Sequence, residues 1–142
     1  MERQLVILTK NYPFDTGEEF IENEIEILSK YFHSIIILAL SCSPNSIQTR
    51  KVPDNVNVYR FCEIQNRNAR YATYILGGLL FANKGCFREI LKIKGIREKL
   101  FAVYLNSKVT RQFRNIVNDS DLLKRLINCD LIIYCYWFSD LP

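Results

Sequence analysis

Residues 4 to 31 read QLVILTKNYPFDTGEEFIENEIEILSKY, which is the pattern of a strand, a polar loop and a helix. Leu5 to Leu8 form an apolar run without a polar interruption, and such runs are typical of parallel strands buried on both faces. After the loop, apolar residues recur at helical spacing, so one stripe of a helix can pack on the sheet. The stripe consists of Ile21, Ile25, Leu28 and Phe32. We therefore expect an α/β fold with the first strand near the centre of the sheet.

The loop between this strand and helix ends in the sequence DTGEE, residues 15 to 19. Thr16 and Glu19 have the spacing of a capping box, which predicts a helix that begins at Gly17 or Glu18. Ligands of open α/β sheets bind at this end of a strand, and free N–H groups at a helix start suit a phosphate. Capped turns of this kind are more often only turns, and the two glutamates add negative charge where a phosphate would lie.

Three later stretches have strand patterns. Residues 34 to 40 are a second continuous apolar run, which predicts a parallel neighbour of the first strand. Residues 56 to 61 alternate apolar and polar side chains, as expected of an edge strand. Residues 131 to 137 predict a fourth parallel strand. His33 precedes the second strand at its amino end, away from the ligand side, so we expect a structural role for it.

The long connection from residue 66 to residue 128 shows no strand pattern and predicts three to five helices. One of them, around Tyr71 to Phe81, is apolar enough to be buried and contains the pair Gly77-Gly78, where a kink is expected. Ser107 and Ser120 are predicted helix caps. A connection of this length indicates helices inserted above the sheet, where an acceptor-binding surface can form.

The composition is that of an ordinary globular domain, with 49% hydrophobic and 24% charged residues among 142. Five scattered cysteines form no C-x-x-C pair, which argues against a zinc site or disulfide framework and favours free thiols in a reducing compartment. They are Cys42, Cys62, Cys86, Cys129 and Cys135. The first apolar run is too short for a signal peptide, and no stretch has the roughly 20 apolar residues of a membrane span. We expect a cytoplasmic protein that binds no metal.

Positive charge is concentrated between residues 84 and 114, where nine Lys or Arg and two Glu give a net charge of +7. Apolar residues interleave with the bases, as in amphipathic helices that lie on anionic membranes. Arg88, Lys92 and Lys99 are the candidates for such a membrane contact. A solvated helix face is the competing interpretation. A further alternative is a non-enzymatic α/β module that docks on anionic membrane or nucleic acid through these helices.

Both ends of the chain resemble the amino-terminal region of bacterial glycosyltransferases of family 4. The similarity is carried by LVILT at residues 5 to 9, NYPF at 11 to 14, GE at 17 and 18, FIENEI at 20 to 25 and DLIIYCYW at 130 to 137. The resemblance implies the GT-B fold, in which two Rossmann-like domains face a cleft. Residues 1 to 142 would then be an incomplete Rossmann-like amino-terminal, acceptor-side domain, truncated before the carboxyl-terminal donor-binding domain.

The resemblance also implies an activity, the transfer of a sugar from a nucleotide-sugar donor to a glycan or lipid-linked acceptor in cell-surface polysaccharide synthesis. Thr16 and Gly17 match the loop that approaches the donor phosphates, while Tyr136 and Trp137 match the acceptor side. No residue is assigned a catalytic role, and neither a metal nor a cofactor besides the nucleotide-sugar substrate is expected. Such an enzyme would lie at the inner face of the membrane and would not bind nucleic acid. Because transfer needs both substrates in one site, we expect the chain alone to be inactive.

Overall fold

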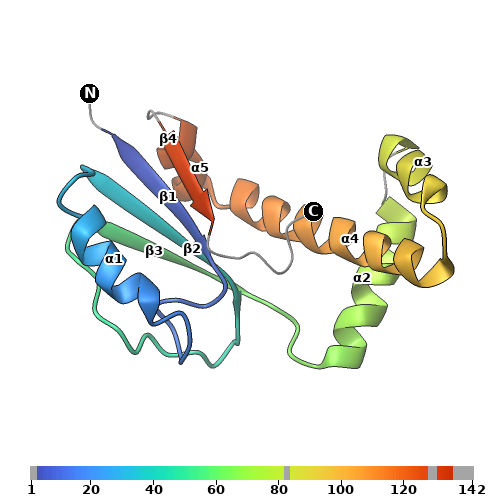
Figure 1. The fold of residues 1–142 in the computed structure, drawn as a ribbon, viewed down its shortest axis with the longest axis horizontal. Coiled ribbons are helices and arrows are strands. Elements are labelled where there is room, and N and C mark those ends of the chain that lie inside the picture. Colours follow the sequence, from blue (N-terminus) through green and yellow to red (C-terminus); the bar gives the residue numbers. More distant parts are fainter. Residues whose placement is uncertain (1–2, 82–83, 128–130, 136–142) are drawn as a thin grey trace. The chain divides into compact units, whose positions relative to one another are not determined.

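The computed structural model describes residues 3–81, 84–127 and 131–135, and these contain four strands and five helices. The chain divides into two compact units (Figure 1). The first, which we call the sheet unit, comprises Met1–Glu63 and Val117–Ser139. The second, the helical unit, is built from Ile64–Ile116. Each unit is described by itself below.

The sheet unit contains a four-stranded parallel sheet in the order β3-β2-β1-β4 (Figure 1). Its strands are β1 (Gln4–Thr9), β2 (Ser34–Cys42), β3 (Val56–Cys62) and β4 (Leu131–Cys135). Leu5 of β1 lies opposite Ile35 of β2 and Ile132 of β4, so β1 is central as predicted. The alternating stretch forms the edge strand β3, which confirms the sequence pattern.

Helices cover both faces of this sheet. On one face, Ile21 and Ile25 of α1 (Phe20–Leu28) are buried in a core with residues of β1 and β2. Those strand residues are Leu5, Ile7, Ile35 and Ile37. Val58 of β3 packs against the same core, so its neighbour Tyr59 points to the opposite face. There the Tyr59 hydroxyl donates to Asp121 of α5 (Ser120–Ile127) at 2.9 Å, which places α5 on the second face.

The predicted helix starts need correction. Helix α1 begins at Phe20 rather than at Gly17 or Glu18, and Thr16 does not cap it. The reason is that Glu18 has a φ of 56°, a left-handed conformation that cannot belong to a right-handed helix. Ser107 is also not a cap, because it lies inside helix α4. At α5 the capping oxygen belongs to Asp119, which accepts the N–H of Leu122 at 3.0 Å, and not to Ser120.

The helical unit contains α2 (Arg67–Phe81), α3 (Lys84–Lys92) and most of α4 (Ile96–Asn118). Helix α2 continues through its glycine pair. A Cβ atom at Gly78 would lie 2.5 Å from Val103 Cγ1 and 2.8 Å from the Val103 carbonyl oxygen, so the glycine permits close approach of α2 and α4. Tyr104 joins the same contact, because its ring stacks on Tyr71 at 4.7 Å.

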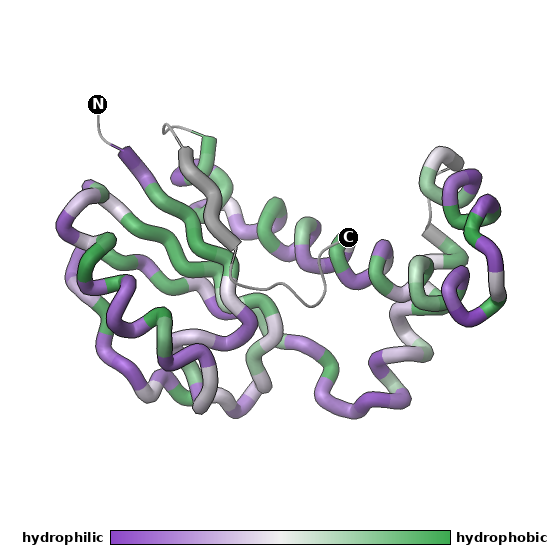
Figure 2. The backbone as a smooth tube through the Cα atoms, viewed as in Figure 1, coloured by the Kyte–Doolittle hydropathy of each residue, from purple (hydrophilic) through white to green (hydrophobic). Residues whose placement is uncertain are grey.

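Hydropathy differs along the two units. The strands β1 and β2 are hydrophobic over most of their length, whereas hydrophilic and hydrophobic residues alternate along α4 (Figure 2). Within the described part of the chain, none of the helices is both long and apolar enough to cross a membrane. Three of the described cysteines, Cys42, Cys62 and Cys86, form no disulfide bond.

Candidate functional site

The loop between β1 and α1 is built around one carboxylate. Glu18 accepts the backbone N–H of Lys10 through Oε1 at 3.0 Å, and those of Asn11 and Tyr12 through Oε2 at 2.9 Å each. These N–H groups follow the carboxyl end of β1, where open α/β sheets place ligands. The side chain of Glu18 therefore occupies the position that a bound anion would take at this edge.

Three residues of this loop have left-handed backbone conformations. The φ angles are 54° at Asp15, 101° at Gly17 and 56° at Glu18, and the Tyr12–Pro13 peptide bond is cis. For a residue other than glycine this conformation costs roughly 1–3 kcal/mol and persists only where the surroundings hold it. A Cβ atom at Gly17 would meet no atom within 4 Å, so open space lies beside this residue.

Arg50, in the segment after β2, contacts several residues of this loop. Its guanidinium donates to the carbonyl oxygen of Gly17 at 2.7 Å and pairs with the Glu19 carboxylate at 3.4 Å. The same group lies over the ring of Tyr12, 5.4 Å from its centre. The backbone N–H groups of Glu19 and Gly17, with a smaller contribution from Arg50, lower the pKa of Glu19. Burial raises the pKa of Tyr12.

A second set of hydrogen bonds fixes Asp15. Its carboxylate accepts from the hydroxyl of Ser46, and its carbonyl oxygen accepts from the hydroxyl of Thr49 at 2.7 Å. Arg60 of β3 then donates to the Ser46 carbonyl oxygen at 2.8 Å and lies over the ring of Phe14. The loop after β1 is thus tied to β3 and to the segment after β2, and it forms a preorganised wall at the carboxyl edge of the sheet.

The predicted phosphate-loop residues lie in this wall. Thr16 is exposed, and its carbonyl oxygen accepts from the side chain of Asn11 at 3.2 Å. The Gly17 N–H donates to Oε1 of Glu19 at 2.8 Å. The structure thus brings Thr16 and Gly17 together in one loop, with the Gly17 donor already bonded to a side chain of the chain itself. The predicted acceptor-side residues, Tyr136 and Trp137, lie outside the described residues.

The predicted membrane-contact residues all belong to the helical unit. Arg88 and Lys92 are exposed on α3, and both approach Glu89, at 3.9 Å and 2.8 Å. Lys99 lies near the start of α4 and is half-buried. Glu89 therefore offsets part of the positive charge that the sequence places on α3.

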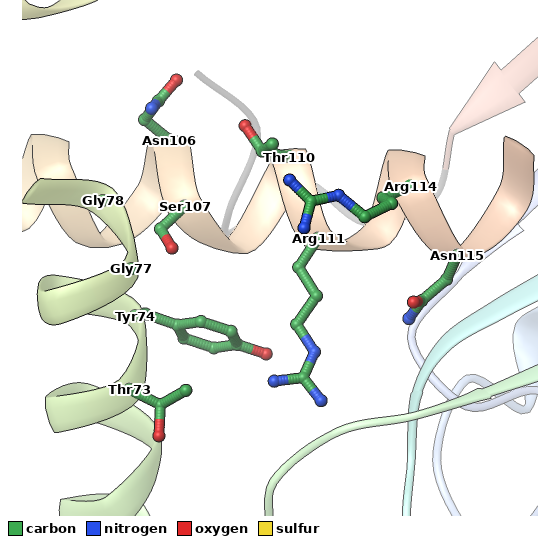
Figure 3. Close-up of a pocket in the computed structure, with 10 residues that line it drawn as sticks. All are labelled: Thr73, Tyr74, Gly77, Gly78, Asn106, Ser107, Thr110, Arg111, Arg114 and Asn115. Atoms are coloured by element: carbon green, nitrogen blue, oxygen red, sulfur yellow. The ribbon is translucent and has the colours of Figure 1, made fainter. Parts of the chain in front are cut away.

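The helical unit also contains a hollow, lined by both polar and apolar surface, that no sequence pattern predicted. This hollow, which we call the α2–α4 hollow, has a volume of about 300 Å³ (Figure 3). Its polar lining includes Thr73, Tyr74, Ser107, Thr110, Arg111 and Arg114. Two signals for it were present in the sequence: the pair Gly77-Gly78, which marks a close helix approach, and the basic residues of α4. Neither signal shows which side chains face each other across two helices.

Compared with known protein families, with curated proteins and with solved structures, the chain matches none of them. Its function is therefore inferred from the braced loop, the sheet topology and the surface of the helical unit.

Proposed function

We propose that this chain is the acceptor-side part of a glycosyltransferase that moves a sugar from a nucleotide-sugar donor to a glycan or lipid-linked acceptor in cell-surface polysaccharide synthesis. The strand order β3-β2-β1-β4 agrees with the first half of a Rossmann-like doubly wound sheet, as in the amino-terminal half of a GT-B fold. One observation carries the proposal. The residues that resemble the family, from Asn11 to Glu18, form the strained and heavily hydrogen-bonded loop at the ligand-binding edge of the sheet.

Each part of the loop has a role in this proposal. Glu18 braces the loop, and the left-handed Gly17 leaves open space for the donor phosphates. Glu19 is the group that the phosphate of a nucleotide sugar would replace at the Gly17 N–H once a donor-binding domain also holds that substrate, because the Glu19 side chain is 71% exposed. We assign the acceptor side to Tyr136 and Trp137, which follow β4, the strand next to β1.

The proposed transfer reaction requires a second domain that binds the donor. Transfer needs donor and acceptor held in near-attack geometry, which supplies roughly 7–11 kcal/mol of the barrier. With Glu18 and Glu19 bonded to the loop donors, the present chain offers the nucleotide sugar only part of a site. A donor-binding domain would complete this site.

Saturation-transfer NMR on the purified chain tests this proposal, with a panel of oligosaccharides and a panel of nucleotide sugars as probes. We expect saturable binding of an oligosaccharide, weak binding of nucleotide sugars and no transfer when both are present. Gly17→Ala should reduce the weak nucleotide-sugar signal, since Gly17 lies in the loop assigned to the donor phosphates and alanine is strained at a φ of 101°. Gly95→Ala is the matched control, because Gly95 has a φ of 92° but belongs to the helical unit.

Three results would contradict the assignment. Sugar transfer by the chain without a second polypeptide would show that it is more than an acceptor-side part. Nucleotide-sugar binding that Gly17→Ala and Gly95→Ala leave equally strong would separate the loop from donor recognition, and the absence of any oligosaccharide binding would contradict the acceptor-side assignment.

A second candidate function is docking on an anionic membrane, and the surface of the helical unit favours it. Among the described residues of this unit, eleven large apolar side chains are exposed. Residues 64–116 also carry eleven Lys or Arg and two Glu, a net charge of +9. Exposed apolar and basic side chains on the same helices are the combination that binds anionic lipid surfaces.

Sedimentation with vesicles tests this candidate. Replacing Arg88, Lys92 and Lys99 by glutamine should weaken binding to anionic vesicles, with roughly 1 kcal/mol at stake per basic residue near the surface. The matched control replaces Lys10, Lys30 and Lys51 of the sheet unit, which removes the same charge elsewhere. Equal loss in both variants, or equal binding to neutral vesicles, would refute a specific surface. Salt-sensitive binding to nucleic acid instead would replace the membrane as partner.

A further inference from the structure

The α2–α4 hollow has the chemistry of an anion site. Its lining contains two guanidinium groups, from Arg111 and Arg114, and the hydroxyls of Thr73, Ser107 and Thr110. No carboxylate is among the described residues that line it. Guanidinium groups present planar sets of N–H donors that match phosphate oxygens in pairs, and hydroxyls add further donors.

The two arginines are available for a ligand. In the described part of the chain, neither Arg111 nor Arg114 makes an ion pair with a carboxylate. Arg50 and Arg125, by contrast, both pair with acids. The Arg111 guanidinium lies 5.9 Å from the centre of the Tyr74 ring, a contact with the ring face that does not use its N–H groups.

The shape of the hollow depends on a glycine. A Cβ atom at Gly77 would lie 3.2 Å from the Ser107 hydroxyl oxygen, so a side chain at this position would crowd that donor. Tyr74 and Ser107 extend into the same space, and the Arg111 side chain lies beside the hydroxyl end of Tyr74 (Figure 3). Side chains from both helices therefore converge on one volume, while Gly77 leaves room above Ser107.

Size and charge select the ligand class. Ligand pockets span roughly 300–1,000 Å³, and the hollow of about 300 Å³ lies at the lower end. A small anionic group fits this volume better than a whole nucleotide sugar does. The net charge of +9 on residues 64–116 adds a long-range field that attracts anions.

We propose that the α2–α4 hollow binds a phosphate or pyrophosphate group, with Arg111 and Arg114 as its charged ligands and Ser107 and Thr110 as hydroxyl donors. The site goes beyond the transferase proposal, since it belongs to the helical unit and requires no nucleotide sugar. The phosphate group that this site binds can belong to either of two ligands, a free phosphate compound or the head group of a phosphorylated lipid. For a phosphorylated lipid, the exposed side chains of Leu76 and Leu80, which also belong to α2, provide apolar surface for contact with the acyl chains.

Isothermal titration of the whole chain with inorganic pyrophosphate at physiological salt tests the site. We expect one saturable site that Arg111→Gln/Arg114→Gln weakens at least about tenfold, because two charge-assisted contacts are lost. The control Lys94→Gln/Arg97→Gln removes the same charge from exposed residues of the helical unit outside the hollow and should leave affinity within about twofold. Gly77→Val should also weaken binding, since it fills the hollow without removing charge. Circular dichroism checks that each variant remains helical.

The outcomes separate a built site from general charge attraction. Equal weakening in the two double variants, or binding that survives Gly77→Val unchanged, would overturn the proposal, as would no binding of pyrophosphate. To distinguish the two ligands, phosphatidylcholine vesicles that contain phosphatidic acid are added. Vesicle binding that pyrophosphate displaces and Arg111→Gln/Arg114→Gln abolishes would identify a lipid phosphate. Pyrophosphate binding in solution, with vesicle binding unchanged in that variant, would identify a free phosphate compound.

Discussion

The sheet unit and the helical unit use their apolar residues differently. Of the twenty buried hydrophobic residues in the described part of the chain, sixteen belong to the sheet unit and four to the helical unit. Of the seventeen large hydrophobic residues that are exposed there, eleven belong to the helical unit. The sheet unit therefore derives its stability from burial, whereas much of the helical unit's apolar surface is available for contact with something else.

The two units also differ in net charge and in the donors that they offer to an anion. Residues 64–116 carry a net charge of +9, and the rest of the chain carries −5. In the sheet unit, the N–H groups that could bind an anion are filled by Glu18 and Glu19. In the helical unit, Arg111 and Arg114 line a hollow without a carboxylate among its described lining residues. The comparison indicates that the sheet edge is a closed, self-bonded wall and the helical unit is the open anion-binding part.

The largest difference should appear when one apolar side chain is removed from each unit. Ile37 of β2 is fully buried, so Ile37→Ala should lower the free energy of unfolding by about 2–5 kcal/mol. Leu80 of α2 is 74% exposed, and Leu80→Ala should change stability by less than about 0.5 kcal/mol. Urea denaturation followed by circular dichroism measures both. Similar losses in the two variants would show that the helical unit has a core equal to that of the sheet.

A smaller loss is expected when the brace of the loop is removed. Glu18→Ala leaves the N–H groups of Lys10, Asn11 and Tyr12 without their carboxylate, and should cost about 2–3 kcal/mol. Glu18→Gln should cost less, since its amide oxygen still accepts. Glu26→Ala, at an exposed acid of α1, is the control. A Glu18→Ala variant as stable as Glu26→Ala would mean that the carboxylate does not hold the loop.

The two glycines of α2 provide a comparison inside the helical unit. Gly78→Ala forces a Cβ against Val103, including its backbone oxygen at 2.8 Å, and such overpacking costs about 1–3 kcal/mol. Gly77→Ala meets only the Ser107 hydroxyl at 3.2 Å, and the gain in helix propensity offsets this contact. Thermal unfolding should therefore separate the variants, with Gly78→Ala the less stable. The reverse order would contradict the close approach of α2 and α4 at Gly78.

The strands could be predicted from the sequence, because the continuous apolar runs of β1 and β2 and the alternation of β3 are local patterns. The loop could not, since Thr16 and Glu19 have capping-box spacing but the partners of Glu18 lie six to eight residues earlier in the chain. The α2–α4 hollow depends on which faces of two helices meet. That information is tertiary, and no spacing within α2 or α4 contains it.

Thiol reactivity gives the smallest expected effect. Burial, with smaller contributions from Cys62 and Asp15, raises the pKa of Cys42 to about 12. An unfolded thiol has a pKa of about 8.5. The buried, protonated thiol of Cys42 therefore makes its full contribution to the stability of the fold below about pH 8.5, and this contribution is lost as the pH rises toward 12. Iodoacetamide at pH 8 should label the exposed Cys62 first and Cys42 only after unfolding. Mass spectrometry of the peptides would contradict this burial if both cysteines were labelled at equal rates.

The contrast between a closed loop and an open hollow can be tested in one titration. Amide chemical shifts of the nitrogen-15-labelled chain are followed while inorganic pyrophosphate is added at physiological salt. We predict saturable shifts at Tyr74, Ser107 and Arg111, and unchanged shifts at Lys10 and Gly17, whose N–H groups already donate to Glu18 and Glu19. Saturable shifts in the loop after β1, with the residues of the hollow unchanged, would contradict the account.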